Sequence, residues 1–345
     1  MRAKQRIKVL IVDDSLLFRE TLAREMAKDE GLEIVGTASD PYMARDLIVK
    51  LKPDVLTLDV EMPKMNGIEF LKKLMPQYPL PVIVVSSASQ NVFDALDAGA
   101  VEFVTKPNMS RQGGMTSFVN ELTVKVKIAS TAKVGNKKNT PLAPNRPLTG
   151  TVSTGVTNQV IAMGASTGGT DALYSVISAL PREMPPIVIV QHMPPVFTKL
   201  YADRLNNSCK LEVKEAADGD ELRPGRVLIA PGDFQMRVAK RGPGYYVRVT
   251  KEDKVSGHCP SVDVLFRSVA EVVKDKAIGV IMTGMGKDGA DGLLKMRKSG
   301  AYTIGQDEKS SVVYGMPMVA FNIGAVQKQL PLDRIPDEII RSLSK

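Results

Sequence analysis

The chain has 345 residues, which is long enough for two domains that each bury a core of their own. Its hydrophobic content of 43% and charged content of 24% are ordinary for a soluble globular protein. No apolar run reaches membrane-spanning length, and the amino terminus lacks the apolar core of a signal peptide. We therefore expect a cytoplasmic protein without membrane insertion.

The two cysteines, Cys209 and Cys259, suit a reduced compartment, and neither belongs to a cluster with metal-ligand spacing. The net charge of +8 raises the question of nucleic-acid binding, so its distribution matters. Residues 1–129 carry 17 basic and 17 acidic side chains, 130–158 carry four basic and none acidic, and 159–345 carry 25 against 21. Because DNA-reading domains concentrate positive charge on one face or helix, we expect no nucleic-acid partner.

The first part of the chain alternates short apolar runs with helical patterns. The apolar runs lie at residues 8–12, 33–36, 54–58, 82–85 and 101–105, and helices are expected through residue 26, near 43–51 and at 116–129. This alternation predicts a doubly wound parallel α/β sheet in a domain spanning 1–129. Such sheets carry their functional site at the carboxyl ends of the strands.

Polar side chains stand at those strand ends. They are Asp13, Asp14, Asp59, Ser87 and Lys106. Three converging carboxylates repel one another unless a hard cation lies among them, and magnesium suits carboxylate oxygens. Asp59 is then a candidate nucleophile toward a phosphoryl group, with Lys106 as counter-charge and Ser87 as a hydroxyl for a phosphoryl oxygen. A single such aspartate is more often a turn or cap residue.

With these residues in place, positions 7–129 resemble the receiver domain of two-component response regulators. The resemblance rests on Asp13-Asp14, Asp59, Ser87-Ala88 and Lys106-Pro107. It implies phosphorylation of Asp59 by a histidine kinase. It also implies magnesium held by Asp13, Asp14 and the backbone carbonyl of Glu61, and it places Phe103 at the position of the aromatic switch residue.

Residues 130–158 are rich in Lys, Asn, Thr, Pro and Gly and nearly free of large apolar side chains, which is typical of a flexible linker. The second domain, 159–345, alternates again. Strands are expected at 160–163, 187–191, 211–215, 227–232 and 277–282, helices at 197–205 and 261–273, and a β-hairpin at 234–239 and 245–250. A parallel α/β sheet with a hairpin insertion accounts for this order.

Ser166 stands in Gly164-Ala165-Ser166-Thr167-Gly168-Gly169, between an apolar strand and an amphipathic helix. At such a junction backbone N–H groups point outward, and the helix dipole favours negative charge. An acyl-transfer serine needs this environment. A Gly-rich phosphate loop or a plain tight turn remains an alternative, since Gly-x-Ser-x-Gly recurs by chance.

The chain contains only two histidines, His192 and His258. His192 directly follows a buried strand, so it is expected on the same sheet edge as Ser166. Histidine is the usual base for a serine nucleophile, although a lone histidine is more often a locally satisfied one. His258 lies in a loop and could border the site.

A catalytic triad of serine, histidine and an acid needs a carboxylate that orients the histidine imidazole. Asp288 is the best candidate because it follows strand 277–282 in a glycine-rich loop at the same edge. The competing carboxylates are Asp171, Asp233, Asp263 and Asp291, of which Asp171 and Asp263 fit helix starts. The order serine, histidine, aspartate differs from that of α/β-hydrolases.

The second domain resembles the catalytic domain of chemotaxis protein-glutamate methylesterases. The matching stretches are 164–169, Gln191-His192-Met193, 258–263 and 283–289. The resemblance implies a triad of Ser166, His192 and Asp288, with Thr167 and Met285 beside the oxyanion.

The same resemblance implies hydrolysis of glutamate γ-methyl esters on chemotaxis receptors and deamidation of receptor glutamines. It implies that phosphorylation activates the enzyme, with magnesium as cofactor for the receiver and none for the esterase site. The alternatives are a DNA-binding response regulator and a nucleotide-binding α/β domain. Neither uses His192, and the second lacks the usual phosphate-loop motifs.

Overall fold

The computed structural model describes residues 5–87, 91–107, 114–135 and 159–343, and it divides into two compact units, Met1–Asn139 and Thr140–Lys345. The division lies inside the expected linker 130–158. That segment lies outside the described residues from 136 onward, so its predicted flexibility stays a prediction. No helix in the described ranges is long and apolar enough to cross a membrane.

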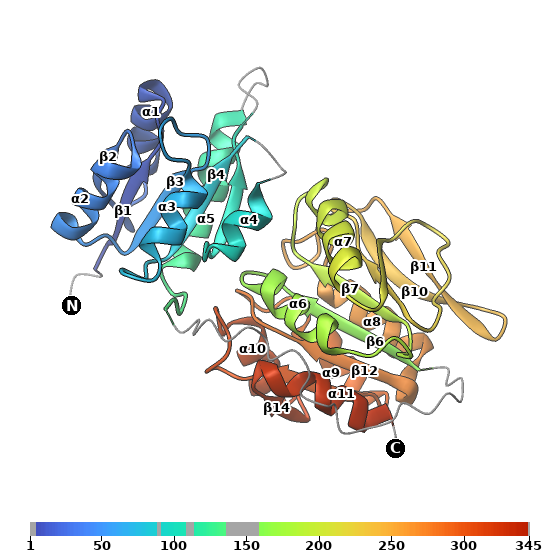
Figure 1. Cartoon of the computed structure of the whole chain (residues 1–345). Coiled ribbons are helices and arrows are strands. Elements are labelled where there is room, and N and C mark those ends of the chain that lie inside the picture. The colour runs from blue at the N-terminus through green and yellow to red at the C-terminus, as the bar shows by residue number, and fades with distance from the viewer. Residues whose placement is uncertain (1–4, 88–90, 108–113, 136–158, 344–345) are drawn as a thin grey trace. The chain divides into compact units, whose positions relative to one another are not determined.

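The amino-terminal unit is a five-stranded parallel sheet flanked by helices (Figure 1). Its strand order is β2-β1-β3-β4-β5, with β1 Ile7–Val12, β2 Leu32–Ala38, β3 Val55–Asp59, β4 Val82–Ser86 and β5 Glu102–Thr105. The helices are α1 Leu16–Met26, α2 Pro41–Leu51, α3 Gly67–Leu74, α4 Val92–Asp97 and α5 Gly114–Ala129. The doubly wound fold predicted from the alternation is confirmed.

Capping residues set where the first helices begin. The Asp40 carboxylate accepts hydrogen bonds from the amides of Tyr42 and Met43, and Pro41 occupies the first helical position. Helix α2 therefore begins two residues before the predicted 43. Ser15 caps α1 in the same manner through the amide of Phe18.

The carboxyl-terminal unit is a seven-stranded parallel sheet in the order β14-β13-β12-β6-β7-β9-β8. The strands are β6 Val160–Ala165, β7 Ile187–Gln191, β8 Glu212–Glu215, β9 Arg226–Ile229, β12 Ala277–Ile281, β13 Tyr302–Gln306 and β14 Lys328–Leu330. The helices are α6 Gly169–Ala179, α7 Phe197–Ser208, α8 Val262–Val272, α9 Ala290–Lys298, α10 Met316–Asn322 and α11 Ile335–Leu343. Strands β6, β7 and β12 are buried along their whole length and form the centre of the core.

The hairpin insertion is a separate two-stranded sheet of β10 Gln235–Arg241 and β11 Gly244–Thr250. Arg241 pairs with Gly244, which leaves a two-residue turn whose first residue, Gly242, has φ +57. A positive φ at this position suits a type II′ hairpin turn, which glycine adopts without steric cost. The predicted hairpin is thus confirmed.

Candidate active site and phosphoacceptor site

Ser166 and His192 directly follow β6 and β7, and Asp288 lies in the loop after β12; these three strands are neighbours in the large sheet. Ser166 is the first residue after β6, and its amide donates to the carbonyl of Thr283 at 3.0 Å. The amide of His192 donates to the carbonyl of Ala165 at 3.2 Å. The three residues therefore share one sheet edge, as the sequence predicted.

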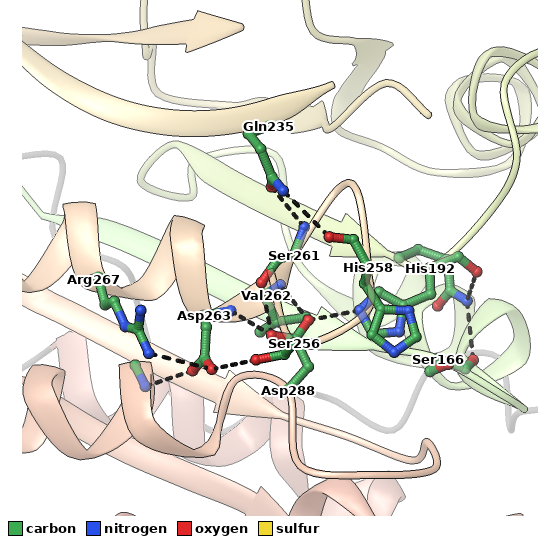
Figure 2. Close-up of polar contacts among 12 residues, drawn as sticks. Ser166, His192, Gln235, Ser256, His258, Ser261, Val262, Asp263, Arg267 and Asp288 are labelled. Carbon is green, nitrogen blue, oxygen red and sulfur yellow. Dashed lines mark hydrogen bonds and ion pairs between the residues drawn. The ribbon is translucent and has the colours of Figure 1, made fainter. Parts of the chain in front are cut away.

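Asp288 and His192 are directly hydrogen-bonded, with 2.8 Å between Oδ2 and Nε2 (Figure 2). Asp288 is buried, with a relative exposure of 1%. Burial disfavours its charged form, but hydrogen bonds from His192, Ser261 and Val262 outweigh that cost and hold the pKa of this carboxyl below its usual value. Asp288 is therefore a carboxylate at neutral pH.

The donors that hold Asp288 come from the start of α8. The Ser261 hydroxyl donates to Oδ1 at 2.7 Å, the Val262 amide to Oδ2 at 2.7 Å and the Asp263 amide to Oδ1 at 3.1 Å. Ser261 occupies the N-cap position of α8, but its side chain bonds to Asp288 and makes no cap bond of its own. The Asp288 carboxylate takes the place of a cap, because it accepts from the first amides of α8. The helix dipole favours a negative charge at this end.

The four other candidate carboxylates lie at helix starts or in a loop. Asp171, Asp263 and Asp291 lie in the first turns of α6, α8 and α9, as expected for the first two. Asp263 accepts from the Gly292 amide at 2.7 Å and pairs with Arg267 at 3.6 Å, so it joins α8 to α9. Asp233 lies in a loop with φ +63.

The second ring nitrogen of His192, Nδ1, is not engaged by Asp288. Nδ1 is buried and has no hydrogen-bond partner among the described residues, while Ser166 is half-buried. No hydrogen bond between described residues joins the Ser166 hydroxyl to this ring. Catalytic hydrogen bonds of free enzymes are often open until substrate binds. Since Nε2 is engaged by Asp288, Nδ1 is the nitrogen left to take a proton.

Gln191 is a positioning residue that reasoning from the sequence assigned no role. It is 3% exposed, and its Nε2 donates to the carbonyls of Ser166 at 3.0 Å and His192 at 3.3 Å. Its amide thereby joins the backbones of Ser166 and His192, the predicted nucleophile and base. The signal in the sequence was a polar side chain closing an otherwise apolar buried strand.

His258 borders the site, as the sequence suggested it could. Its ring stacks on that of His192, with 3.7 Å between centroids and 8° between planes. Burial, and then the neighbouring His192, lower the pKa of His258 to about 4. His258 is therefore neutral at physiological pH.

The loop after β12 lies against Ser166. A Cβ atom on Gly284 would lie 2.4 Å from Met316 Sδ and 2.7 Å from Ser166 Cβ, so only glycine fits there. Met285 follows at 43% exposure, and no described residue accepts a hydrogen bond from its amide. Thr167 is buried, and its carbonyl accepts from the Thr283 hydroxyl at 2.9 Å.

In the other unit, one ligand oxygen each from Asp13, Asp14 and Asp59 lies within 4.8 Å of the others. Lys106 Nζ lies 2.7 Å from Asp59 Oδ2 and 2.9 Å from Asp13 Oδ2. Burial raises the pKa of Asp59 above its usual value, and Lys106 only partly offsets this. Apart from this ion pair with Lys106, no described residue contacts the buried Asp13 Oδ2 with hydrogen-bond geometry. This acidic pocket is compatible with a magnesium ion.

Two further residues of the predicted phosphoacceptor site, Ser87 and Glu61, form a hydrogen-bonded chain to Asp59. Ser87 follows β4, and its hydroxyl donates to the Glu61 carboxylate at 2.6 Å. The Glu61 amide donates to Asp59 Oδ1 at 3.1 Å. Phe103 is buried in β5 with Lys125 over its ring, and Ala88 lies outside the described residues.

Comparison with known proteins matches both units. The family described as CheB methylesterase matches residues 161–339, and the family described as response regulator receiver domain matches residues 9–113. A protein-glutamate methylesterase/protein-glutamine glutaminase of Syntrophomonas wolfei is 54% identical, with 99% of each chain covered. One from Syntrophotalea carbinolica is 52% identical, again with 99% of each covered.

A solved structure is also similar. The crystal structure of the Thermotoga maritima CheB methylesterase catalytic domain aligns with a TM-score of 0.53 and 42% identity, over 54% of this chain and 100% of that one. Together with the relatives that match over full length, these similarities establish the family. The chain belongs to the CheB methylesterases, with a response regulator receiver domain ahead of the catalytic domain.

Proposed function

We propose that this chain is a phosphorylation-activated serine hydrolase that removes γ-methyl esters from glutamate side chains of chemotaxis receptors and deamidates their glutamines. The observation that carries the proposal is the hydrogen bond between His192 Nε2 and the buried Asp288 carboxylate, on the sheet edge where Ser166 stands. Relatives about half identical over their full length bear the names of both activities.

In this mechanism His192 Nδ1 removes the Ser166 hydroxyl proton as Oγ attacks the ester carbonyl. The protonated ring donates the same proton to the departing methoxide, so methanol leaves and an acyl-enzyme remains. Water, deprotonated by His192, then releases the glutamate carboxylate and restores the Ser166 hydroxyl. Asp288 stays ionised and stabilises the positive ring in both steps. For a glutamine substrate the leaving group is ammonia.

The oxyanion of each tetrahedral intermediate needs fixed donors. We assign them to backbone amides at Thr167 and Met285, because the close contact at Gly284 holds the loop of Met285 against Ser166. The Met285 amide, which donates to none of the described residues, supports this assignment.

Asp59 is the proposed phosphoacceptor, with a chemotaxis histidine kinase as donor. Asp13, Asp14, the Asp59 carboxylate and the Glu61 carbonyl would hold magnesium, which offsets charge on the phosphoryl oxygens. Lys106 already lies on Asp59 and supplies a second positive charge. Ser87 would leave Glu61 to bind a phosphoryl oxygen, and Phe103 would repack.

Release of labelled methanol from methylated receptor membranes tests the esterase. Ser166→Ala, His192→Ala and Asp288→Ala should each lower the rate steeply, on the order of 10⁴-fold for the serine or histidine. A folded Ser166→Ala protein with near-normal turnover would overturn the assignment. Ammonia release from receptors carrying glutamine tests the deamidase in the same variants.

The receiver is proposed to restrain the esterase until it is phosphorylated. A coupling free energy of about 1–3 kcal/mol changes a rate roughly 5–150-fold, which suffices for a switch. Methylesterase rates of the full chain, the phosphorylated full chain and a fragment from about residue 158 test this. The fragment should outpace the unphosphorylated chain. If it does not, phosphorylation has to act by positive stimulation.

A further inference from the structure

We propose that His258 is a positioning residue for the esterase reaction: its stacked ring fixes the plane of the His192 imidazole, with Nε2 on Asp288 and Nδ1 left for Ser166. This inference rests on the proposed function of Ser166, His192 and Asp288. It assigns His258 no proton transfer of its own.

One hydrogen bond does not fix the orientation of an imidazole. The Nε2–Oδ2 bond of 2.8 Å directs one edge of the His192 ring to Asp288, but this bond by itself does not set the tilt of the ring plane. A planar group packed on its face blocks that tilt. His258 is such a group, parallel to His192 within 8° at a centroid separation of 3.7 Å.

The backbone of His258 is itself held firmly. Its amide and carbonyl both bond to Val255 at 2.9 Å, around a two-residue turn in which Ser256 and Gly257 have φ +54 and +85. Gln235 is fully buried, and its Nε2 donates to the His258 carbonyl at 3.2 Å. Fixed backbone on both sides limits the positions that the ring can take.

The same segment also orients Asp288 (Figure 2). Gln235 Oε1 accepts from the Ser261 amide at 2.9 Å, and Ser261 in turn donates its hydroxyl to Asp288. A single stretch, 258–263, therefore carries both the ring that packs on His192 and the donors that set its carboxylate partner.

The neutral state of His258 suits a ring that packs on His192 during the reaction. When His192 takes the serine proton it becomes a cation, and a neutral aromatic face is a favourable neighbour for a cation. Burial and the adjacent His192 keep His258 neutral by lowering its pKa to about 4. Two stacked charged rings would repel each other, so a neutral His258 leaves the positive charge to the ring that Asp288 stabilises.

The test uses the full-length protein with three replacements of the ring: His258→Phe keeps a flat face, His258→Gln keeps polarity without the face, and His258→Ala removes both. Lys251→Ala, an exposed change in the same connecting segment, is the control. The readouts are kcat and KM for methanol release from methylated receptors, the rate of Ser166 labelling by a fluorophosphonate, and Tm.

Because a misplacement of about 1 Å costs roughly 100-fold in rate, we expect His258→Ala and His258→Gln to lower kcat by about 10–100-fold. KM should change by less than about threefold, since binding contacts are untouched. Ser166 labelling should slow in parallel, His258→Phe should recover most of the rate, and Lys251→Ala should behave as wild type.

Two results would overturn the inference. One is that His258→Phe is as slow as His258→Gln, because a flat ring at this position would then not restore the rate. The other is that His258→Gln matches wild type in kcat and labelling. If His258→Ala does not fold, the comparison of His258→Phe with His258→Gln still tests the inference. A wild-type protein that neither releases methanol nor labels at Ser166 would instead refute the proposed function.

Discussion

The hydroxyl of Ser261 lies 2.7 Å from Oδ1 of Asp288, so the proposed acid of the triad also closes the amino terminus of α8. The amides of Val262 and Asp263 bind the same carboxylate. One buried group thus serves the catalytic site and the packing of a core helix. Changes at Asp288 should therefore affect both activity and stability.

Asp288→Ala should lower the free energy of unfolding as well as the rate. The substitution removes the helix cap and leaves the Ser261 hydroxyl and two amides buried without acceptors, which costs about 1–3 kcal/mol. Urea unfolding of the full chain measures this, with Ser166→Ala as the matched control, since Gly168 and not Ser166 is the N-cap of α6. Equal stability of the two variants would contradict the role of Asp288 as a cap.

Gly284→Ala should inactivate the esterase while the chain still folds. The added Cβ would lie 2.4 Å from Met316 Sδ and 2.7 Å from Ser166 Cβ, so the loop or the serine must shift. A shift of this size displaces the proposed oxyanion donor, whose loss costs about 10²–10³ in kcat. Gly244→Ala is the control, because the nearest atom to its Cβ would be 4.0 Å away. Normal turnover by Gly284→Ala would exclude this loop from the oxyanion site.

Phosphorylation should require both Asp59 and a divalent cation. Incubation with magnesium and a small phosphodonor should label the chain, while Asp59→Asn or chelation of the metal should abolish the label. Since burial raises the pKa of Asp59, labelling should weaken as the pH falls and the carboxylate is protonated. Lys106→Met should shift this loss to higher pH, because a cation that favours the carboxylate is removed. Labelling of Asp59→Asn, or labelling without metal, would show that the acidic cluster is misassigned.

His258 should titrate near pH 4, well below an ordinary histidine. The chain has only two histidines, so NMR of the imidazole carbons resolves both, and His258→Phe assigns them. Between pH 4 and 6.5 the unfolded chain binds the proton and the folded one does not. The stability from a neutral His258 is thus complete above pH 6.5 and is lost as the pH falls toward 4. A His258 signal that titrates near pH 6.5 would contradict the buried stack.

Much of the site was predictable because it depends on strand ends. Apolar runs predicted the strands, and in parallel sheets the carboxyl ends meet at one edge. The strand ends therefore predicted that Ser166, His192 and Asp288 lie at one sheet edge. They made the same prediction for Asp13, Asp59 and Lys106 in the other domain. Strand ends were predicted less accurately than strand positions. The strand predicted at 160–163 continues in the structure as β6 through Ala165, because Gly164 and Ala165 are also buried.

Contacts between segments far apart in the chain could not be predicted in this way. The sequence left four carboxylates in competition with Asp288, and only the folded chain brings the amino terminus of α8 onto it. The stacking of His258 on His192 joins two loops 66 residues apart in numbering. The backbone of His258 is bonded in turn by the side-chain amide of Gln235, which lies on a third element, β10. Strand position is set by local hydrophobic pattern, whereas these side-chain contacts depend on how whole elements pack, and no local pattern encodes that.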